Sequence, residues 1–320
     1  MDYLFEKITE NIRNHDNTII MTHRHPDLDG MSSAVCLYEV IKSFKKEVYV
    51  VVPTEIVNNS LKKGLDYLRK KIDIAFITYP DVLEVISDKT LLIVLDTQKP
   101  VLVQFKELLN IKDILVIDHH VNSSIHIENT LFEYINSNKS SVVEIMVEYL
   151  KYLNFDLNEY AATLMLAGID IDTHSYSLKT TSNTFLAASF LLDCGASLEI
   201  KNELLKESRE DVLKRNRNID KSYFIKKGFL LCDMGSVEET VDLAILADEL
   251  LRLDGVQVSF TVGRILDTVY VSARSMGKIS VSVIMSALGG GGHVTDAACE
   301  FKNKTNEEVI KMIKDIVLEV

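Results

Sequence analysis

The first half of the chain alternates short apolar runs with segments of helical spacing. The apolar runs are rich in Val, Ile and Leu with little polar alternation, and they lie at residues 17–22, 47–52, 90–96 and 113–118. Strands buried on both faces of a parallel sheet have this pattern. Helical spacing recurs between and after the runs, at residues 33–44, 101–109, 140–153 and 158–171. The alternation predicts a doubly wound, mainly parallel α/β sheet with helices on both faces.

A different pattern begins at Leu198. Residues 198–222 are highly charged, carry Leu and Ile at helical intervals and contain no Gly or Pro, which is typical of a solvated helix. A smaller α/β domain is expected beyond it, with strands at residues 229–232, 256–262 and 268–273 and helices at residues 241–251 and 279–288. The predicted organisation is a catalytic domain over residues 1–197, a helical linker over 198–222 and a second domain over 223–320.

Composition narrows the class of protein. At 320 residues the chain is long enough for two domains. The formal charge of −12 argues against a long nucleic-acid partner, which needs a basic face, but it permits a short phosphorylated substrate whose charge bound cations would offset. The four cysteines lie far apart without CxxC spacing, and no stretch has the pattern of a signal peptide or a membrane span. We therefore expect a soluble, cytoplasmic protein with reduced thiols and no membrane contact.

Acidic and imidazole side chains follow three of the predicted strands. They are His23, Asp27, Asp29, Asp96, Asp118, His119 and His120. A further pair, Asp170 and Asp172, ends an apolar helical segment. A lone Asp at a strand end favours a loop cap, but three strand ends that share His and Asp favour a ligand site, because ligands gather at the carboxyl ends of the strands in open α/β sheets. Carboxylate and imidazole ligands suit Mn²⁺, and two such ions can act on a phosphoryl group.

The pattern does not fix every ligand. Asp27 and Asp29 are two residues apart, which suits one ligand for each ion. We assign His119 as a ligand and His120 as a phosphate contact or proton donor, although the sequence alone also allows the reverse. The role of His25 stays open, because its neighbours already supply enough ligands.

The second domain carries a glycine-rich loop. Four consecutive glycines and a histidine follow a helical segment, at Gly289, Gly290, Gly291, Gly292 and His293. Such a run lets the backbone approach a ligand closely with its amides free to meet phosphate, whereas ending a helix needs only one glycine. Arg274 follows a predicted strand and is either a bidentate phosphate contact or a surface residue.

Together these motifs resemble those of the DHH phosphoesterase superfamily and its DHH-associated C-terminal domain. The resemblance rests on residues 23–29, Asp96, residues 118–120, Asp172, residues 272–277 and the glycine–histidine loop, and it covers nearly the whole chain in the same order. Residues 91–100, 167–185 and 282–298 look most like the cyclic-di-AMP phosphodiesterases, in a stand-alone form without upstream sensor domains. One departure is Gly30, where many relatives have Ala.

The resemblance implies a role for each candidate residue. One Mn²⁺ would take His23, Asp27 and Asp96. The second would take Asp29, His119 and Asp172 together with Asp96, which bridges the two ions. His120 would stabilise or protonate the developing charge. The nucleotide would be contacted from the second domain by Arg274, Gly289, Gly290, Gly291, Gly292 and His293. A homodimer is also common in such proteins.

Three functional hypotheses follow. The leading one is a Mn²⁺-dependent phosphodiesterase that hydrolyses cyclic di-AMP, the linear dinucleotide pApA, or both, to AMP. The second is an oligoribonuclease of the same superfamily that also acts as a phosphoadenosine-phosphate phosphatase and needs the same metals. A non-catalytic nucleotide sensor ranks lowest, because every proposed ligand position holds a competent residue. The expected partner is a small dinucleotide or short oligonucleotide.

Overall fold

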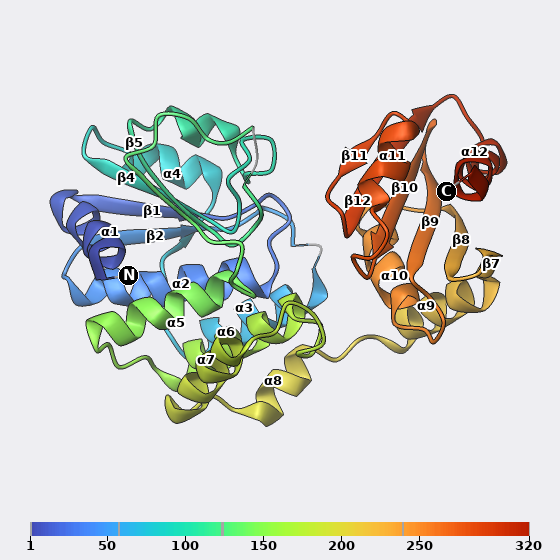
Figure 1. Cartoon of the computed structure of the whole chain (residues 1–320). Coiled ribbons are helices and arrows are strands. Elements are labelled where there is room, and N and C mark those ends of the chain that lie inside the picture. Colours follow the sequence, from blue (N-terminus) through green and yellow to red (C-terminus); the bar gives the residue numbers. More distant parts are fainter. Residues whose placement is uncertain (1, 57, 123–124, 239, 320) are drawn as a thin grey trace. The chain divides into compact units, whose positions relative to one another are not determined.

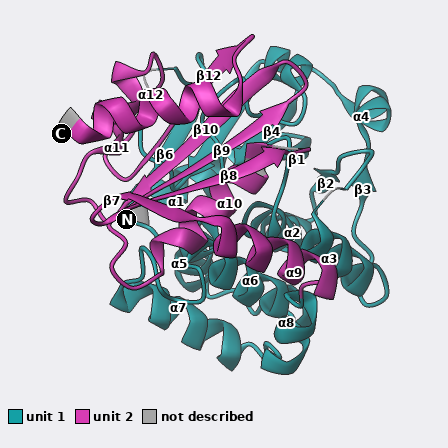
Figure 2. Ribbon diagram, turned by 90° about the vertical axis from the view of Figure 1, so that its right-hand side faces the viewer, with its two compact units in different colours: residues 1–206 teal, residues 207–320 magenta. Residues whose placement is uncertain are grey.

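The computed structural model describes residues 2–56, 58–122, 125–238 and 240–319. The chain divides into two compact units, residues 1–206 and residues 207–320 (Figure 1, Figure 2). Each unit is built around a six-stranded sheet of its own. The mixed α/β class predicted from the sequence is therefore confirmed for both halves of the chain.

The sheet of the first unit is parallel throughout. Its strands are β1 (Asn17–Met21), β2 (Glu47–Val51), β3 (Phe76–Ile77), β4 (Thr90–Leu95), β5 (Asp113–Asp118) and β6 (Phe132–Ile135). Their order is β3-β2-β1-β4-β5-β6, so the chain moves outward in one direction from β1 and in the other from β4. Ligands of such sheets bind outside the carboxyl ends of the strands, at the point where the order reverses. That point lies between β1 and β4.

Helices cover both faces of this sheet (Figure 1). They are α1 (Asp2–Asn14), α2 (Leu28–Ser43), α3 (Asn59–Arg69), α4 (Tyr79–Val85), the 3₁₀ helix η1 (Lys106–Asn110), α5 (Val142–Leu153), α6 (Glu159–Asp172), α7 (Ser182–Asp193) and α8 (Leu198–Leu204). Successive strand residues point to opposite faces. Ile20 and Ile93 therefore join the large core that includes α1, α2, α5 and α6, while Ile19 and Leu92 join a smaller core with α4 and η1.

The predicted helix over residues 101–109 is wrong. Only η1 is helical there, and the residues before it run beside the chain that leaves β1. Val103 forms a bridge with His23, and the amide of Gln104 donates a hydrogen bond to the carbonyl of Thr22. Residues 101 and 102 form a turn, and these backbone bonds tie residues 103 and 104 to the chain that leaves β1, so tertiary contacts override the helical spacing.

The charged segment over residues 198–222 contains two helices instead of one. Helix α8 belongs to the first unit, and α9 (Arg209–Lys221) belongs to the second. The side chain of Ser208 accepts a hydrogen bond from the amide of Asp211 and thereby begins α9. The catalytic and substrate-binding roles assigned to the two halves of the chain stay a prediction.

The second unit has a mixed sheet. Its strands are β7 (Tyr223–Lys226), β8 (Phe229–Ser236), β9 (Val258–Ile265), β10 (Thr268–Ser275), β11 (Gly291–Gly292) and β12 (Asp296–Lys302), and its remaining helices are α10 (Thr240–Leu251), α11 (Val281–Ala287) and α12 (Asn306–Glu319). The strand order is β11-β12-β10-β9-β8-β7, with β8 and β9 parallel and the other pairs antiparallel. Helices α11 and α12 pack on one core, and α10 supplies Leu246 and Leu250 to another.

None of the helices in the described ranges combines the length and the apolar composition that crossing a bilayer requires.

Candidate metal centre

The site begins where the strand order of the first unit reverses. His23 follows β1, Asp96 follows β4, and Nε2 of His23 lies 3.4 Å from Oδ2 of Asp96. Asp96 is buried and has a φ of 63°, in the left-handed region that few residues other than glycine adopt. Its amide donates a hydrogen bond to the carbonyl of Ile117 in β5, which holds the residue there. Backbone strain of this kind is common at functional sites.

Gly30 lets the start of α2 approach Asp96. A Cβ atom at position 30 would lie 3.1 Å from Oδ2 of Asp96 and 3.3 Å from its Cβ. Contacts this tight would push the Asp96 side chain by a few tenths of an ångström. Gly30 therefore bears on the geometry of a proposed ligand, a role that its position in the sequence does not indicate.

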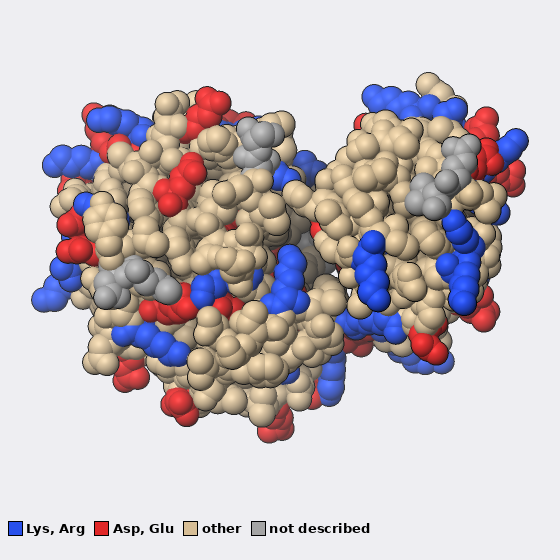
Figure 3. Space-filling model, viewed as in Figure 1, with Lys and Arg blue, Asp and Glu red and all other residues tan. Residues whose placement is uncertain are grey.

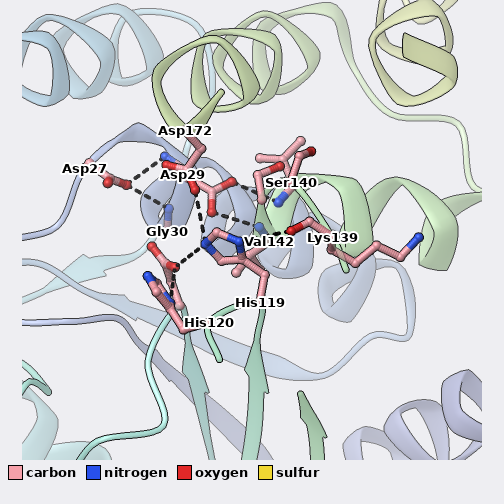
Figure 4. A network of polar contacts seen from close by, with 12 residues as sticks. Asp27, Asp29, Gly30, His119, His120, Lys139, Ser140, Val142 and Asp172 are labelled. Carbon is pink, nitrogen blue, oxygen red and sulfur yellow. Dashed lines mark hydrogen bonds and ion pairs between the residues drawn. The ribbon is translucent and has the colours of Figure 1, made fainter. Parts of the chain in front are cut away.

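Helix N-termini hold two of the carboxylates (Figure 4). Oδ1 of Asp27 accepts hydrogen bonds from the amides of Asp29 and Gly30 at 2.9 and 3.2 Å, so Asp27 is the N-cap of α2. The two carboxylate oxygens of Asp29 accept bonds from the first amides of α5, Val142 at 2.8 Å and Val143 at 2.9 Å. The positive end of a helix dipole stabilises a carboxylate in this position.

The two adjacent histidines differ in their surroundings. His119 is buried, and its Nε2 atom lies 3.1 Å from Oδ2 of Asp172 and 3.4 Å from Oδ1 of Asp96. The His120 side chain is 53% exposed, and its Nδ1 donates a hydrogen bond of 2.7 Å to Oδ1 of Asp118. The surroundings of His119 are those of a ligand, and those of His120 suit a group that meets substrate.

The predicted ligands come together in three overlapping groups, in each of which the potential ligand atoms lie within 4.8 Å of one another. The groups are His23 with Asp27 and Asp96, Asp29 with His119 and Asp172, and Asp96 with His119 and His120. Two other candidates point elsewhere. His25 is exposed and accepts a hydrogen bond from Arg24, and Asp170 pairs with Lys201 at 2.5 Å.

Two buried atoms of the site lack a hydrogen bond of normal geometry from any described residue. They are Oδ1 of Asp96 and Nε2 of His119. Buried polar atoms nearly always have a partner, so an exception calls for an explanation. A cation between imidazole and carboxylate ligands would satisfy both atoms, and this set of donors fits Mn²⁺ or a similar divalent ion.

Burial and neighbouring negative charge raise the pKa of two carboxylates of the site. Burial, followed by the charges of Asp96 and Asp172, raises the pKa of Asp27 to about 6. The same causes raise the pKa of Asp29 well above its ordinary value. Cations bound among these groups would relieve the repulsion and restore the ionised form.

The neighbouring carboxylates raise the pKa values of the two histidines and so favour their charged form. Burial lowers the pKa of a histidine, but at His23 the adjacent Asp96 outweighs it and the pKa rises to about 9. At His119, burial is outweighed by Asp172 and Asp96, and the pKa rises to about 12. In the absence of metal, protonated histidines thus offset part of the carboxylate charge.

The four glycines of the second unit have different local surroundings. Gly289 ends α11 with a φ of 83°. A Cβ atom at Gly290 would lie 2.2 Å from the carbonyl oxygen of Ala298, and one at Gly292 would lie 2.4 Å from Cα of Ala297. A Cβ atom at Gly291 would meet nothing within 4 Å. A Cβ atom at Gly289 would also meet nothing within 4 Å, but its positive φ favours glycine, so Gly291 is the member of the run that neither packing nor backbone conformation explains.

Arg274 is held by contacts that the sequence did not reveal. Its Nε donates to Oδ1 of Asp248 in α10 at 2.9 Å, and its Nη1 donates to Oγ of Ser272 at 3.0 Å. His293 in the same unit is exposed, and its amide donates to the carbonyl of Asp296 at 2.6 Å. The pairing of Arg274 with a residue 26 positions earlier leaves no local sequence signal.

Two segments of the chain match known protein families. Residues 17–169 match the N-terminal domain of the DHH family, and residues 226–319 match the DHHA1 domain. The chain is 34% identical to the cyclic-di-AMP phosphodiesterase GdpP of Bacillus subtilis and 33% identical to the cyclic-di-AMP phosphodiesterase PdeA of Listeria monocytogenes. These alignments cover 97% and 96% of this chain but 49% and 48% of the two relatives, so the chain spans about half of their length.

A solved structure shares the fold. The crystal structure of an exopolyphosphatase-related protein from Bacteroides fragilis matches with a TM-score of 0.82 at 19% identity, over 100% of this chain and 96% of that one. The chain thus combines an N-terminal domain of the DHH family with a DHHA1 domain.

Proposed function

We propose that this protein is a metal-dependent phosphodiesterase that hydrolyses cyclic di-AMP, pApA, or both, to AMP. The observation that carries the proposal is the convergence of imidazole and carboxylate groups at the strand reversal, where two buried ligand atoms receive no hydrogen bond of normal geometry from the described residues. The alignment of nearly the whole chain with two cyclic-di-AMP phosphodiesterases supports the choice of substrate.

The proposed metal sites correspond to the groups of neighbouring histidine and aspartate side chains described above. His23, Asp27 and Asp96 would hold one Mn²⁺, and Asp29, His119 and Asp172 would hold a second together with Asp96. When bound, two such ions activate water and neutralise charge on a phosphoryl group.

His120 is suited to protonate the leaving group. Its Nδ1 is engaged by Asp118, whose other oxygen accepts a hydrogen bond from Nε2 of Gln98 at 3.0 Å, so the ring is fixed with Nε2 directed away from Asp118. Desolvation lowers the pKa of His120, but the hydrogen bond to Asp118 and the negative charges of Asp96 and Asp118 together outweigh it, and the pKa is raised. When the bond from phosphorus to the ribose oxygen breaks, the proton of His120 passes to that oxygen.

Substrate recognition is assigned to the second unit. Arg274 would contact a phosphate while Asp248 holds its Nε, and the loop of Gly289, Gly290, Gly291, Gly292 and His293 would meet the nucleotide through its backbone. On the face shown in Figure 3, acidic and basic side chains are mixed over both units. A mixed surface suits a short substrate better than a long nucleic acid, which favours a continuous basic face.

A competition assay tests the proposal. The purified protein is incubated with Mn²⁺ and equal amounts of cyclic di-AMP, pApA, phosphoadenosine phosphate and a short RNA, and the products are separated by chromatography. We expect preferential loss of the two adenine dinucleotides with formation of AMP. Preferential loss of phosphoadenosine phosphate and RNA would establish the oligoribonuclease alternative, and no turnover of any substrate would contradict the proposed function.

A further inference from the structure

A buried carboxylate lies beside the candidate metal centre without belonging to it. Glu144 is in the first turn of α5 and is 1% exposed. Its Oε2 accepts hydrogen bonds from the amide of Ser140 at 3.1 Å, the hydroxyl of Ser140 at 2.7 Å and the hydroxyl of Thr184 at 3.1 Å. Its Oε1 accepts a bond of 3.0 Å from Nζ of Lys139, which is also buried. Four donors therefore converge on one carboxylate.

Glu144 binds Lys139 and Ser140, and the segment that they begin, residues 139–143, supports two of the proposed ligands (Figure 4). The carbonyl of Lys139 lies 3.4 Å from Nδ1 of His119, a long contact that favours a proton on Nδ1 and leaves Nε2 directed at the carboxylates. Three and four residues after Lys139, the amides of Val142 and Val143 at the start of α5 bond both oxygens of Asp29. Displacement of residues 139–142 would therefore disturb His119 and Asp29 together.

The other group of ligands is positioned by different elements. Asp27 is fixed by the first amides of α2, and Asp96 is fixed through its backbone bond to Ile117 of β5. His23 is placed by the end of β1 and its bridge to Val103. The carboxylates of the two groups are therefore held by different amides, at the start of α2 for Asp27 and at the start of α5 for Asp29. The groups are linked by the shared Asp96 and by the backbone of Asp29, whose amide bonds Asp27.

We propose that Glu144 is a positioning residue for the site formed by Asp29, His119 and Asp172, and that it sets the metal affinity of this site while leaving the other unchanged. The inference rests on the proposed metal dependence. Groups that orient metal ligands typically contribute a factor of about 10–100 to metal affinity.

The measurement is calorimetric titration of Mn²⁺ into the metal-free full-length chain, so the readout is binding and not turnover. In Glu144→Gln, an amide NH₂ group replaces one carboxylate oxygen. This group cannot accept the hydrogen bonds that the oxygen accepted, so the donors around it lose their partner. We expect two sites in the wild-type protein, and in the variant one site weakened by about 10–100-fold with the other unchanged. Combining the change with Asp27→Asn should weaken both sites.

Glu148→Gln is the matched control. Glu148 also pairs with Lys139, at 2.5 Å, but it is part-exposed, and its carboxylate accepts from Lys139 and not from Ser140. We expect this variant to bind both ions as the wild type does. Thermal unfolding checks whether Glu144→Gln is folded. If it is not, Ser140→Ala is the second variant, because it removes the 2.7 Å hydroxyl contact without changing charge. We expect it to weaken the same site to a smaller degree.

Three results would overturn the proposal: unchanged binding at both sites in Glu144→Gln and Ser140→Ala, equal weakening of both sites, or the same effect in Glu148→Gln. Absence of Mn²⁺ binding by the wild-type protein is a distinct result, because it would overturn the proposed metal dependence and this inference with it.

Discussion

The Oδ1 atom of Asp96 lies 3.4 Å from Nε2 of His119, and both buried atoms lack a hydrogen bond of normal geometry from the described residues. Asp96 also faces His23, so a single carboxylate lies between the two ligand groups. A residue in that position can serve both ions. Its replacement should therefore have a larger effect than the loss of a ligand from one group.

Asp96→Ala should abolish both Mn²⁺ binding sites and reduce the rate of dinucleotide hydrolysis by at least about 10³-fold, because several kcal/mol of charge stabilisation by the ions is lost. Calorimetry and product chromatography measure the two effects. The matched control is Asp113→Asn, at the amino end of β5, where the carboxylate pairs with His15 far along the strand from Asp118. Full activity of Asp96→Ala would contradict the metal assignment.

His120→Asn should slow hydrolysis of the dinucleotide by about 10²–10⁴-fold, the usual contribution of a general acid, while Mn²⁺ binding stays the same. With bis(p-nitrophenyl) phosphate, whose leaving group needs no protonation, the variant should lose little activity. Rates measured with both substrates separate the roles. Equal losses with the two esters would show that His120 is not the proton donor.

Gly291→Ala should impair substrate binding, whereas Gly290→Ala should lower the stability of the fold. A methyl group at Gly291 meets open space, so we expect an unchanged Tm with a KM raised by at least about 10-fold, because the methyl group blocks the close approach of substrate. A methyl group at Gly290 meets the carbonyl of Ala298, and overpacking should lower stability by about 1–3 kcal/mol or more. Thermal unfolding and steady-state kinetics distinguish them. An unaltered KM in Gly291→Ala would exclude this position from substrate contact.

Binding of Mn²⁺ should release protons at pH 7. The pKa values of His23 and His119 are raised to about 9 and about 12 in the metal-free protein, so both rings are protonated at pH 7, whereas a metal ligand must be neutral. The apparent affinity should therefore rise with pH from 7 toward 9, as less work is needed to deprotonate His23. Calorimetry in two buffers of different ionisation enthalpy counts the released protons. Binding without proton release would contradict ligation by these rings.

The strand ends were predictable because two simple signals coincide there. Runs of Val, Ile and Leu define buried strands, and the polar residue that follows each run must lie at the carboxyl edge of the sheet. That reasoning gave the parallel sheet and led to Asp96 and residues 118–120. It did not give the reversal of strand order between β1 and β4, which depends on pairing between distant segments.

Other features lie outside what local patterns encode. Residues 101–105 have helical spacing, yet residues 101 and 102 form a turn, and backbone bonds tie residues 102–104 to the segment after β1. The break before α9 had a usable signal, since Ser208 followed by Asp211 three residues later is a common helix start. The spacing of Ser141 and Glu144 signals the start of α5, but it does not signal the contact of Glu144 with Thr184, and Asp248 gave no local signal, because these contacts come from groups brought together by folding.

The bonds between Asp29 and the start of α5 affect which substitutions are tolerated at positions 142 and 143. Because main-chain amides hold the carboxylate, they place no demand of their own on the side chains at positions 142 and 143, whose substitution is constrained by the core alone. Proline is the exception. The first position of a helix is ordinarily where proline is most welcome, but at Val142 it would remove a donor to Asp29. A substitution that usually stabilises the start of a helix would here remove a hydrogen bond that positions a proposed metal ligand.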